Sequence, residues 1–398
     1  MAVGEYNGKK FNTMVFEKYL DRVPNLARNE LIKNGVYDVK NKYKNLMTNQ
    51  DGGDYIITPI KGLLDGEVQN YDGVVSMTPT STKTFTQGKP VFGRMKAWQE
   101  KDFAMELTGI DWIKDIAGEV AKYYEGVDQA DLIAILTGIF GMNTQSGYSA
   151  QGNADFVNNH TYDITADTNP EVSASTLNNA VQKGLGANKG IITLAFMNSV
   201  VATNLENLSL LTYMLYNDAN GIQRQLNIGT WNGRVVIVDD DIPTTEVDAV
   251  YEKTTDVAID TSKTYYTKSG DTYTPVAEPD VDDIADYYEM TEEGYTAYTT
   301  YLLGRGAFEY ENIGVRVASE VNRDPATNGG IDVLYTRQRH LVAPKWISYT
   351  KAQQASNSAT TAELADGRNW ELVNDGATSG RTFVNHKAIP IVRIISRG

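Results

Sequence analysis

The chain contains no cysteine among its 398 residues, which excludes disulfides, thiolate metal ligands and thiol nucleophiles. Long apolar runs are also missing. Two of the longest cover residues 132–136 and 235–238, far fewer than the ~20 apolar residues that cross a bilayer. The N-terminus lacks the apolar core of a signal peptide, so we expect neither export through the Sec pathway nor attachment to a membrane.

Histidine is scarce, with His160, His340 and His386 as the three examples. Their spacing matches no metal-binding motif, and we interpret them as ordinary core or surface residues. No Gly-x-Ser-x-Gly string is present to form a serine nucleophile elbow. Residues 184–190 approach a dinucleotide-binding loop, but the glycine spacing is wrong and the segment follows a predicted helix.

Two aspartate clusters, at 239–241 and 280–283, are the remaining candidates for a metal-binding site. The second fails the calcium-binding EF-hand pattern because Ala285 occupies the position where the sharp turn needs glycine. Weak binding of a divalent ion is the alternative to solvated loop charge at both clusters. We therefore expect no cofactor, no metal and no catalytic residue, and the sequence favours a structural protein over an enzyme.

The formal net charge of −15 is unevenly distributed along the chain. Residues 244–293 hold 14 acidic and 3 basic side chains, a local net charge of −11, so the other 348 residues carry only −4. Residues 1–50 have the opposite bias, with a net charge of +4. This balance excludes the broad cationic face with which proteins coat nucleic acid.

The first hundred residues contain little that could pack on itself. Residues 1–50 are polar and predict an arm with one short helix. A strand is predicted at 55–60, and threonines at alternate positions from 80 to 86 predict an extended ribbon with two polar faces. Because an isolated ribbon is marginally stable at best, we expect it to lie on a neighbouring chain.

Regular elements dominate after residue 107. Apolar residues at three- and four-residue steps predict a helix of ~30 residues over 108–140. Residues 141–170 are predicted to be loop-rich, because Asn, Ser, Thr, Gly and Asp dominate there. Residues 244–293 predict a small acidic β subdomain with six tyrosines. Around it we expect helices at 173–184 and 199–211, and strands at 191–197, 231–239, 300–303, 313–321, 331–342 and 389–395.

Several short strings stand in an informative order: FGRMKAWQEKD at 92–102, ELTGID at 106–111, LTGIF at 136–140, GTWNGRVVIVDD at 229–240, LGRGAF at 303–308, EVNRD at 320–324 and LYTR at 334–337. Together with the order of the elements, they resemble a major capsid (coat) protein of tailed bacteriophages with the Hong Kong 97-type fold. The first three strings resemble the ribbon-to-spine segment of such proteins. The fourth resembles the central strand of the axial domain, and the last three resemble the return into the peripheral domain.

The resemblance implies an α+β, Hong Kong 97-like capsid fold with a small β-rich insertion. Its parts would be an N-terminal arm (1–50), an extended loop with flanking strands (51–107), the spine helix and peripheral domain (108–184), the first part of the axial domain (185–243), the insertion (244–293), the axial return (294–320) and the C-terminal strands of the peripheral domain (321–398).

The resemblance also implies a function. Copies of the chain would form the hexamers and pentamers of an icosahedral head that encloses double-stranded DNA without sequence-specific binding. Portal and scaffolding proteins are the expected partners, and the insertion is a candidate site for a decoration protein. The expected location is the virion, after assembly in the host cytoplasm. The alternatives are an encapsulin-like compartment shell and, from a different class, an α/β hydrolase or a sugar-binding protein.

The candidate subunit contacts are aromatic and basic side chains of the arm and the ribbon. They are Phe16 and Tyr19 in the arm, and Phe85, Lys89, Phe92 and Trp98 in the ribbon. For each aromatic residue, packing inside its own chain is the alternative interpretation.

Overall fold

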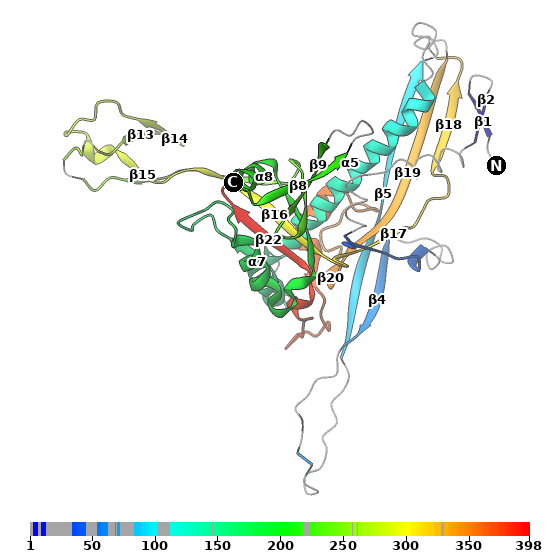
Figure 1. Cartoon of the computed structure of the whole chain (residues 1–398), viewed down its shortest axis with the longest axis horizontal. Helices are drawn as coiled ribbons and strands as arrows, with labels where there is room; N and C mark the ends of the chain where they lie inside the picture. The colour runs from blue at the N-terminus through cyan, green and yellow to red at the C-terminus, as the bar shows by residue number, and fades with distance from the viewer. Residues whose placement is uncertain are drawn as a thin grey trace.

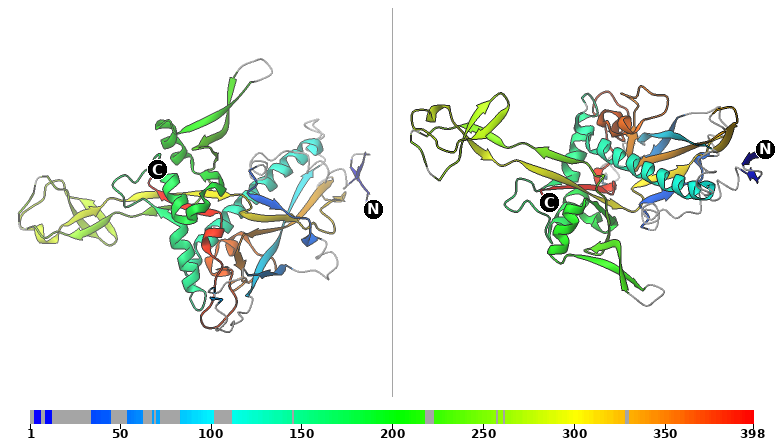
Figure 2. Two further views of the ribbon diagram at one scale, coloured as in Figure 1. Left: turned by 60° about the horizontal axis from the view of Figure 1, so that its bottom comes forward. Right: turned by 90° about the horizontal axis from the view of Figure 1, so that it is seen from above.

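The computed structural model describes residues 3–6, 9–12, 34–44, 54–62, 68, 70–71, 83–101, 112–144, 146–217, 223–256, 258–260, 262–327 and 330–398. Within these residues, three sheets of four or more strands and one long helix organise the chain (Figure 1). The smallest of the three sheets lies at the end of a slender ribbon, apart from the body in every view (Figure 2). The domain boundaries expected from the sequence stay predictions.

The ribbon sheet is built around the long strand β5 (Thr84–Lys101). The first part of β5, up to Pro90, pairs antiparallel with β4 (Tyr55–Lys61), and the part from Val91 onward pairs antiparallel with β19 (Ile331–Pro344). The other strands are β3 (Tyr37–Val39), β17 (Phe308–Asn312) and β18 (Ser319–Asp324). At about 3.4 Å per residue, the 18 residues of β5 extend about 60 Å.

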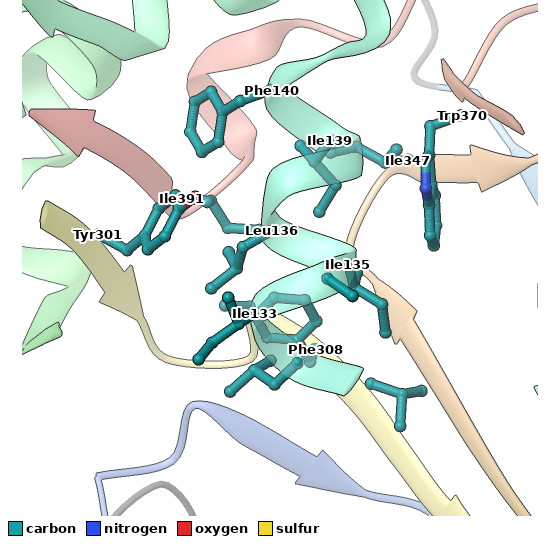
Figure 3. Packing of buried hydrophobic residues seen from close by; sticks show 14 of the residues in the cluster. Ile133, Ile135, Leu136, Ile139, Phe140, Tyr301, Phe308, Ile347, Trp370 and Ile391 are labelled. Carbon is teal, nitrogen blue, oxygen red and sulfur yellow. The ribbon is translucent and has the colours of Figure 1, made fainter. Parts of the chain in front are cut away.

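Helix α5 (Trp112–Phe140) lies along the ribbon sheet and ends in the centre of the molecule (Figure 1). Its 29 residues correspond to about 44 Å of helix, which confirms the long helix predicted over 108–140. In its first half, Val120 and Tyr124 pack against Leu334 of β19. Its last turns carry apolar side chains on several faces, because the ribbon sheet lies on one side and the second large sheet on the other (Figure 3).

The main core surrounds the end of α5. Phe140 stacks on Phe156 and on Tyr301, with ring centroids 6.0 Å and 5.8 Å apart. On the opposite side, Trp370 is fully buried, and its indole N–H donates to the carbonyl of Leu364 at 2.8 Å. A Cβ at Gly138 would lie 2.2 Å from that same carbonyl oxygen, so only glycine allows the helix to approach this segment so closely.

The central sheet has the strand order β6–β22–β16–β7–β10–β9–β8, with β11 added on β16. Parallel pairs (β7 with β10, and β6 with β22) occur beside antiparallel ones, which is typical of a mixed α+β sheet. Its strands are β6 (Thr161–Asp163), β7 (Ile192–Met197), β8 (Leu211–Asn217), β9 (Gln223–Trp231), β10 (Arg234–Val238), β11 (Thr244–Val247), β16 (Tyr295–Gly304) and β22 (Ile391–Ser396). Its helices are α6 (Ala150–His160), α7 (Thr176–Leu185) and α8 (Ser199–Asn207).

The insertion sheet is reached through the two-stranded ribbon formed by β11 and the start of β16. Its strands, in spatial order, are β12 (Val250–Lys253), β15 (Tyr288–Glu292), β13 (Tyr265–Ser269) and β14 (Thr272–Pro275). The smaller elements of the chain are the hairpin β1 (Val3–Tyr6) and β2 (Lys9–Asn12), the pair β20 (Ile347–Tyr349) and β21 (Trp370–Leu372), and helix α9 (Thr361–Ala365).

Three expectations from the sequence were wrong in detail. The segment 141–170 contains helix α6, because Phe156, Val157 and His160 line one buried face between polar residues. The helix expected to reach residue 211 ends at Asn207, where Ser209 follows with a left-handed φ of 57°. The strand expected from residue 313 starts only at Ser319. Among the described residues, no helix has the length and apolar character needed to span a membrane.

Candidate subunit interfaces

A buried charge cluster anchors the base of the ribbon. Lys89 on β5 is 2% exposed, and its Nζ donates to Tyr43 Oη at 2.7 Å and forms an ion pair with Glu309 of β17. Burial lowers the pKa of Lys89, and the Glu309 carboxylate opposes part of this shift. Burial also raises the pKa of Tyr43. The buried Glu311 accepts the backbone N–H groups of Tyr43 and Lys44 at 2.9 Å and 2.6 Å, so this cluster joins the ribbon, β17 and the chain near residue 43.

A second polar link ties the ribbon to the spine helix. Arg94 of β5 makes two hydrogen bonds with the carboxylate of Asp131 on α5, at 2.9 Å from Nε and 2.7 Å from Nη2. Asp131 is 3% exposed and also accepts from Thr361 Oγ1 at 2.8 Å. Arg94 Nη1 donates to the carbonyl of Ala359 at 2.8 Å. One partly buried arginine therefore connects β5, α5 and the segment before α9, with the bidentate geometry that makes such pairs strong.

Aromatic packing fixes the far end of β5 on the same helix. Trp98 contacts Tyr123 and Tyr124 edge to face, with ring centroids 5.4 Å and 6.3 Å apart. The hydroxyl of Tyr124 lies 2.8 Å from Thr336 Oγ1 on β19. The side of the ribbon sheet that faces α5 is thus held by an ion pair, ring contacts and hydrogen bonds along most of its length.

The opposite side of the ribbon sheet is buried at its base, where Val91 packs with Tyr43 and Ile313, and is exposed further along β5. Burial alternates over residues 333–337 of β19, where Leu334 faces α5 and Tyr335 is 36% exposed. On β5, Met95 is 81% exposed, and Ala97 pairs with Tyr335 across the two strands. We call Met95, Ala97 and Tyr335 the outer patch. An apolar patch of this kind on a regular sheet face is typical of a protein contact surface.

The predicted contact residues occupy different environments. Phe85, Lys89 and Phe92 are 8%, 2% and 1% exposed, so packing within the chain accounts for most of their surface. Trp98 is partly exposed and lies against α5. Phe16 and Tyr19 lie outside the described residues. Contact of these six residues with a neighbouring subunit stays a prediction.

The outer patch was missed from the sequence, although alternation carried a signal for it. Trp98 and its cross-strand partner Leu334 point toward α5. Side chains one residue away on each strand must then point to the other face. The apolar character of Met95 and Tyr335 makes that face a candidate contact surface.

The histidines and the aspartate clusters have local structural roles. His160 is buried beside His386, and His340 lies 2.9 Å from Tyr310 Oη. Asp240 accepts the backbone N–H of Ser199 at the start of α8, and Asp280 accepts the N–H of Asp282. In the described part of the chain, no group of three or more His, Asp or Glu side chains is arranged to hold a metal ion.

Comparison with known proteins finds phage capsid proteins that are similar to this chain. No family model matches the sequence. The major capsid protein of Bacillus phage SPP1 is 23% identical over 343 residues, covering 86% of this chain and 86% of that protein. Among solved structures, the capsid of cyanophage Pam1 is similar with a TM-score of 0.47 at 11% identity, over 92% of this chain and 90% of that one. The capsid of Ralstonia phage GP4 has a TM-score of 0.44 at 11% identity, over 79% and 84% of the two chains.

The sequence relationship with the SPP1 protein confirms the resemblance to phage major capsid proteins. The expected α+β, Hong Kong 97-like fold is also confirmed. Its long ribbon strand is β5, its spine helix is α5, and two large sheets meet at the end of that helix.

Proposed function

We propose that this chain is the major capsid protein of a tailed bacteriophage, a structural protein whose copies assemble into the icosahedral head around double-stranded DNA. The outer patch is the observation that carries the proposal. It places exposed apolar side chains on a long strand that is held firmly from its other face. The relationship with the SPP1 capsid protein, over 86% of both chains, supports the same role.

The way in which β5 is held favours assembly. Association normally costs free energy because loops and side chains become ordered at the interface. Here the links from Lys89, Arg94 and Trp98 order the ribbon within one subunit. A neighbour therefore meets a surface that is already in place, and each contact contributes more of its energy to assembly. Stable protein interfaces bury about 1,600 Å², and a subunit enclosed in a shell adds several such contacts.

We infer the remaining partners from the same role. Hexamers and pentamers of the chain build the shell, and portal and scaffolding proteins take part in assembly in the host cytoplasm. The virion is the final location, and the insertion is the proposed site for a decoration protein. The DNA is enclosed without sequence-specific binding, since the net charge of −15 does not favour a broad contact with phosphates.

The test replaces two exposed residues of the outer patch, in the double variant Met95→Asp/Tyr335→Asp. Both side chains are solvent-exposed in the subunit, so the variant should fold normally. The matched control, Val250→Asp/Val281→Asp, adds the same two charges at exposed positions of the insertion. Deleting residues 70–95 is a less clean test, because it would also remove the buried Lys89 and Phe92.

Sedimentation velocity and negative-stain electron microscopy give the readout. The natural chain and the control should form shells, whereas the patch variant should sediment as a folded subunit near 44 kDa. Shells formed equally well by the patch variant would contradict the role of the outer patch. A natural chain that stays near 44 kDa would contradict the shell function itself. Particles containing a protein cargo instead of DNA would favour the encapsulin-like alternative.

A further inference from the structure

The insertion sheet has two different faces. One face packs on the small core of Tyr265, Ile284 and Tyr287. The opposite face carries one tyrosine from each of its four strands. These residues, which we call the tyrosine face, are Tyr251, Tyr266, Tyr273 and Tyr288. Because the insertion stands away from the two large sheets (Figures 1 and 2), neither of them covers this face.

The four rings of the tyrosine face are ordered by one another. Tyr251 and Tyr273 stack face to face, with centroids 4.1 Å apart and an interplanar angle of 10°. Tyr266 packs edge-on against Tyr251 at 4.9 Å, and Tyr288 packs edge-on against Tyr273 at 5.4 Å. Little side-chain entropy remains to be lost on binding, which is the property that makes tyrosine effective at the centre of protein interfaces.

Charge surrounds the tyrosine face. Lys253 lies 3.5 Å from Asp286, whose side chain is 86% exposed, and Lys268 lies over the ring of Tyr273 at 5.3 Å. The third lysine, Lys263, pairs with Asp256 and Glu289. Each of the three lysines of the insertion thus contacts an acidic or an aromatic side chain. With these lysines counted, residues 244–293 still have a net charge of −11. Asp286, Asp271 in the turn between β13 and β14, and Glu292 at the end of β15 form what we call the acidic rim.

These features select among possible occupants of the face. A second copy of the insertion would bring another −11 charge and be repelled, as would a nucleic acid or an anionic membrane. A saccharide binds on open ring faces, but here the rings of Tyr251 and Tyr273 cover one another. A protein contact remains, because interfaces combine an aromatic and methionine-rich centre with a charged rim. Met290, 41% exposed on β15, extends the centre in that way.

We propose that the tyrosine face and its acidic rim form a docking surface for a protein partner with a basic contact surface. The stacked rings and Met290 form the apolar centre, and the carboxylates of the rim attract and orient the partner. Complementary charge raises the association rate and discriminates against acidic proteins. This surface is complete within one insertion, so the proposal does not depend on assembly of a shell.

The experiment uses the full chain and two fluorescent 12-residue peptides. One peptide contains six lysines and three tryptophans, and the other has the tryptophans replaced by serine. Two variants change the charge equally at exposed sites: Met290→Arg lies at the edge of the tyrosine face, and Val281→Arg lies in the loop before β15. Fluorescence anisotropy at 0.15 M salt gives the dissociation constants. Circular dichroism checks folding, and sedimentation of the same samples reports assembly separately.

We expect the tryptophan peptide to bind the natural chain at least tenfold more tightly than the serine peptide. Met290→Arg should weaken that binding at least tenfold, and Val281→Arg less than threefold. Equal effects of the two substitutions, or equal affinity for the two peptides, would show unspecific attraction to negative charge and overturn the proposal. Retention of the natural chain on cellulose or chitin, lost in Met290→Arg, would identify a saccharide surface instead and also overturn it.

Discussion

The stability of this fold should depend on pH through one buried histidine. His160 ends helix α6, is 0% exposed and stacks on Phe156 with ring centroids 4.4 Å apart. Its Nδ1 lies 2.6 Å from the carbonyl oxygen of Ile391, so Nδ1 carries the hydrogen and donates. Its Nε2 then accepts from Nδ1–H of His386 at 3.1 Å. A second proton on His160 would have to displace that hydrogen bond.

The size of the effect follows from the pKa of His160. Burial lowers this pKa from its ordinary value of 6.5 to about 4; hydrogen bonding with the backbone of Ile391 and His386 opposes part of this shift, and the charge of His386 adds to it. The unfolded chain therefore takes up a proton below pH 6.5 that the folded chain does not accept until about pH 4. Stability is lost as the pH falls through this window, by about 3 kcal/mol in total and about 2.5 kcal/mol by pH 4.5. Burial and the charge of Lys387 lower the pKa of His386, and the charge of Asp155 raises it.

The substitution His160→Gln removes the titration but keeps an amide that can donate to Ile391 and accept from His386. Urea unfolding should be measured at pH 7 and pH 4.5 in the Met95→Asp/Tyr335→Asp background, so that assembly does not contribute. Between pH 7 and pH 4.5, we expect the free energy of unfolding to fall by about 2 kcal/mol more in the protein with His160 than in the His160→Gln variant. Val157→Ala, a destabilising change on the same helix, should keep the natural pH dependence. If His160→Gln loses as much stability between pH 7 and pH 4.5 as the protein with His160, protonation of His160 is not the cause of the pH dependence.

Two further substitutions test the links that hold the ribbon and its neighbouring loop. Arg94→Met should destabilise the subunit by about 3 kcal/mol in urea unfolding, because Asp131 stays buried without its cation. Arg368→Met, which breaks an exposed pair with Asp366, should cost less than about 1 kcal/mol, and equal losses would contradict the buried role of Arg94. Hydrogen bonds from Ser356 and the backbone of Thr360 lower the pKa of Glu363 from 4.5 to about 2, so its contribution is present above pH 4.5 and is lost as the pH falls toward 2. Thermal melting of Glu363→Gln should show lower stability at pH 6 and a shallower decline between pH 4.5 and pH 2.5, and a parallel decline would contradict this.

Local sequence patterns predicted the elements whose structure is decided locally. The apolar steps of α5 persist for 29 residues, so its helical period was visible without knowledge of its neighbours. Asn232 and Gly233 have φ values of 53° and 76° between β9 and β10, the left-handed pair that a two-residue hairpin turn requires. Helix α6 was missed because only a few of its residues face the core, and polar residues fill the rest.

Contacts between distant segments could not be predicted in this way. Lys89 pairs with Glu309, which lies 220 residues further along the chain, and Arg94 pairs with Asp131 on another element. No local pattern distinguishes the buried Lys89 and the partly buried Arg94 from the exposed lysines nearby. The threonines at 80–86 predicted a ribbon with two polar faces. Further along β5, one face packs against α5 through such distant partners, Arg94 and Trp98 among them.

The insertion shows how adjacent tyrosines can serve two faces at once. Tyr265 and Tyr266 are consecutive, as are Tyr287 and Tyr288, and strand alternation sends the first of each pair to the core and the second to the tyrosine face. The buried hydroxyls still need polar partners. Tyr265 donates to Asp256 at 2.8 Å, and Tyr287 accepts the backbone N–H of Asp280 at 3.1 Å. Some acidic residues thus stabilise the core side of the insertion, whereas the acidic rim lies beside a face that its core does not use.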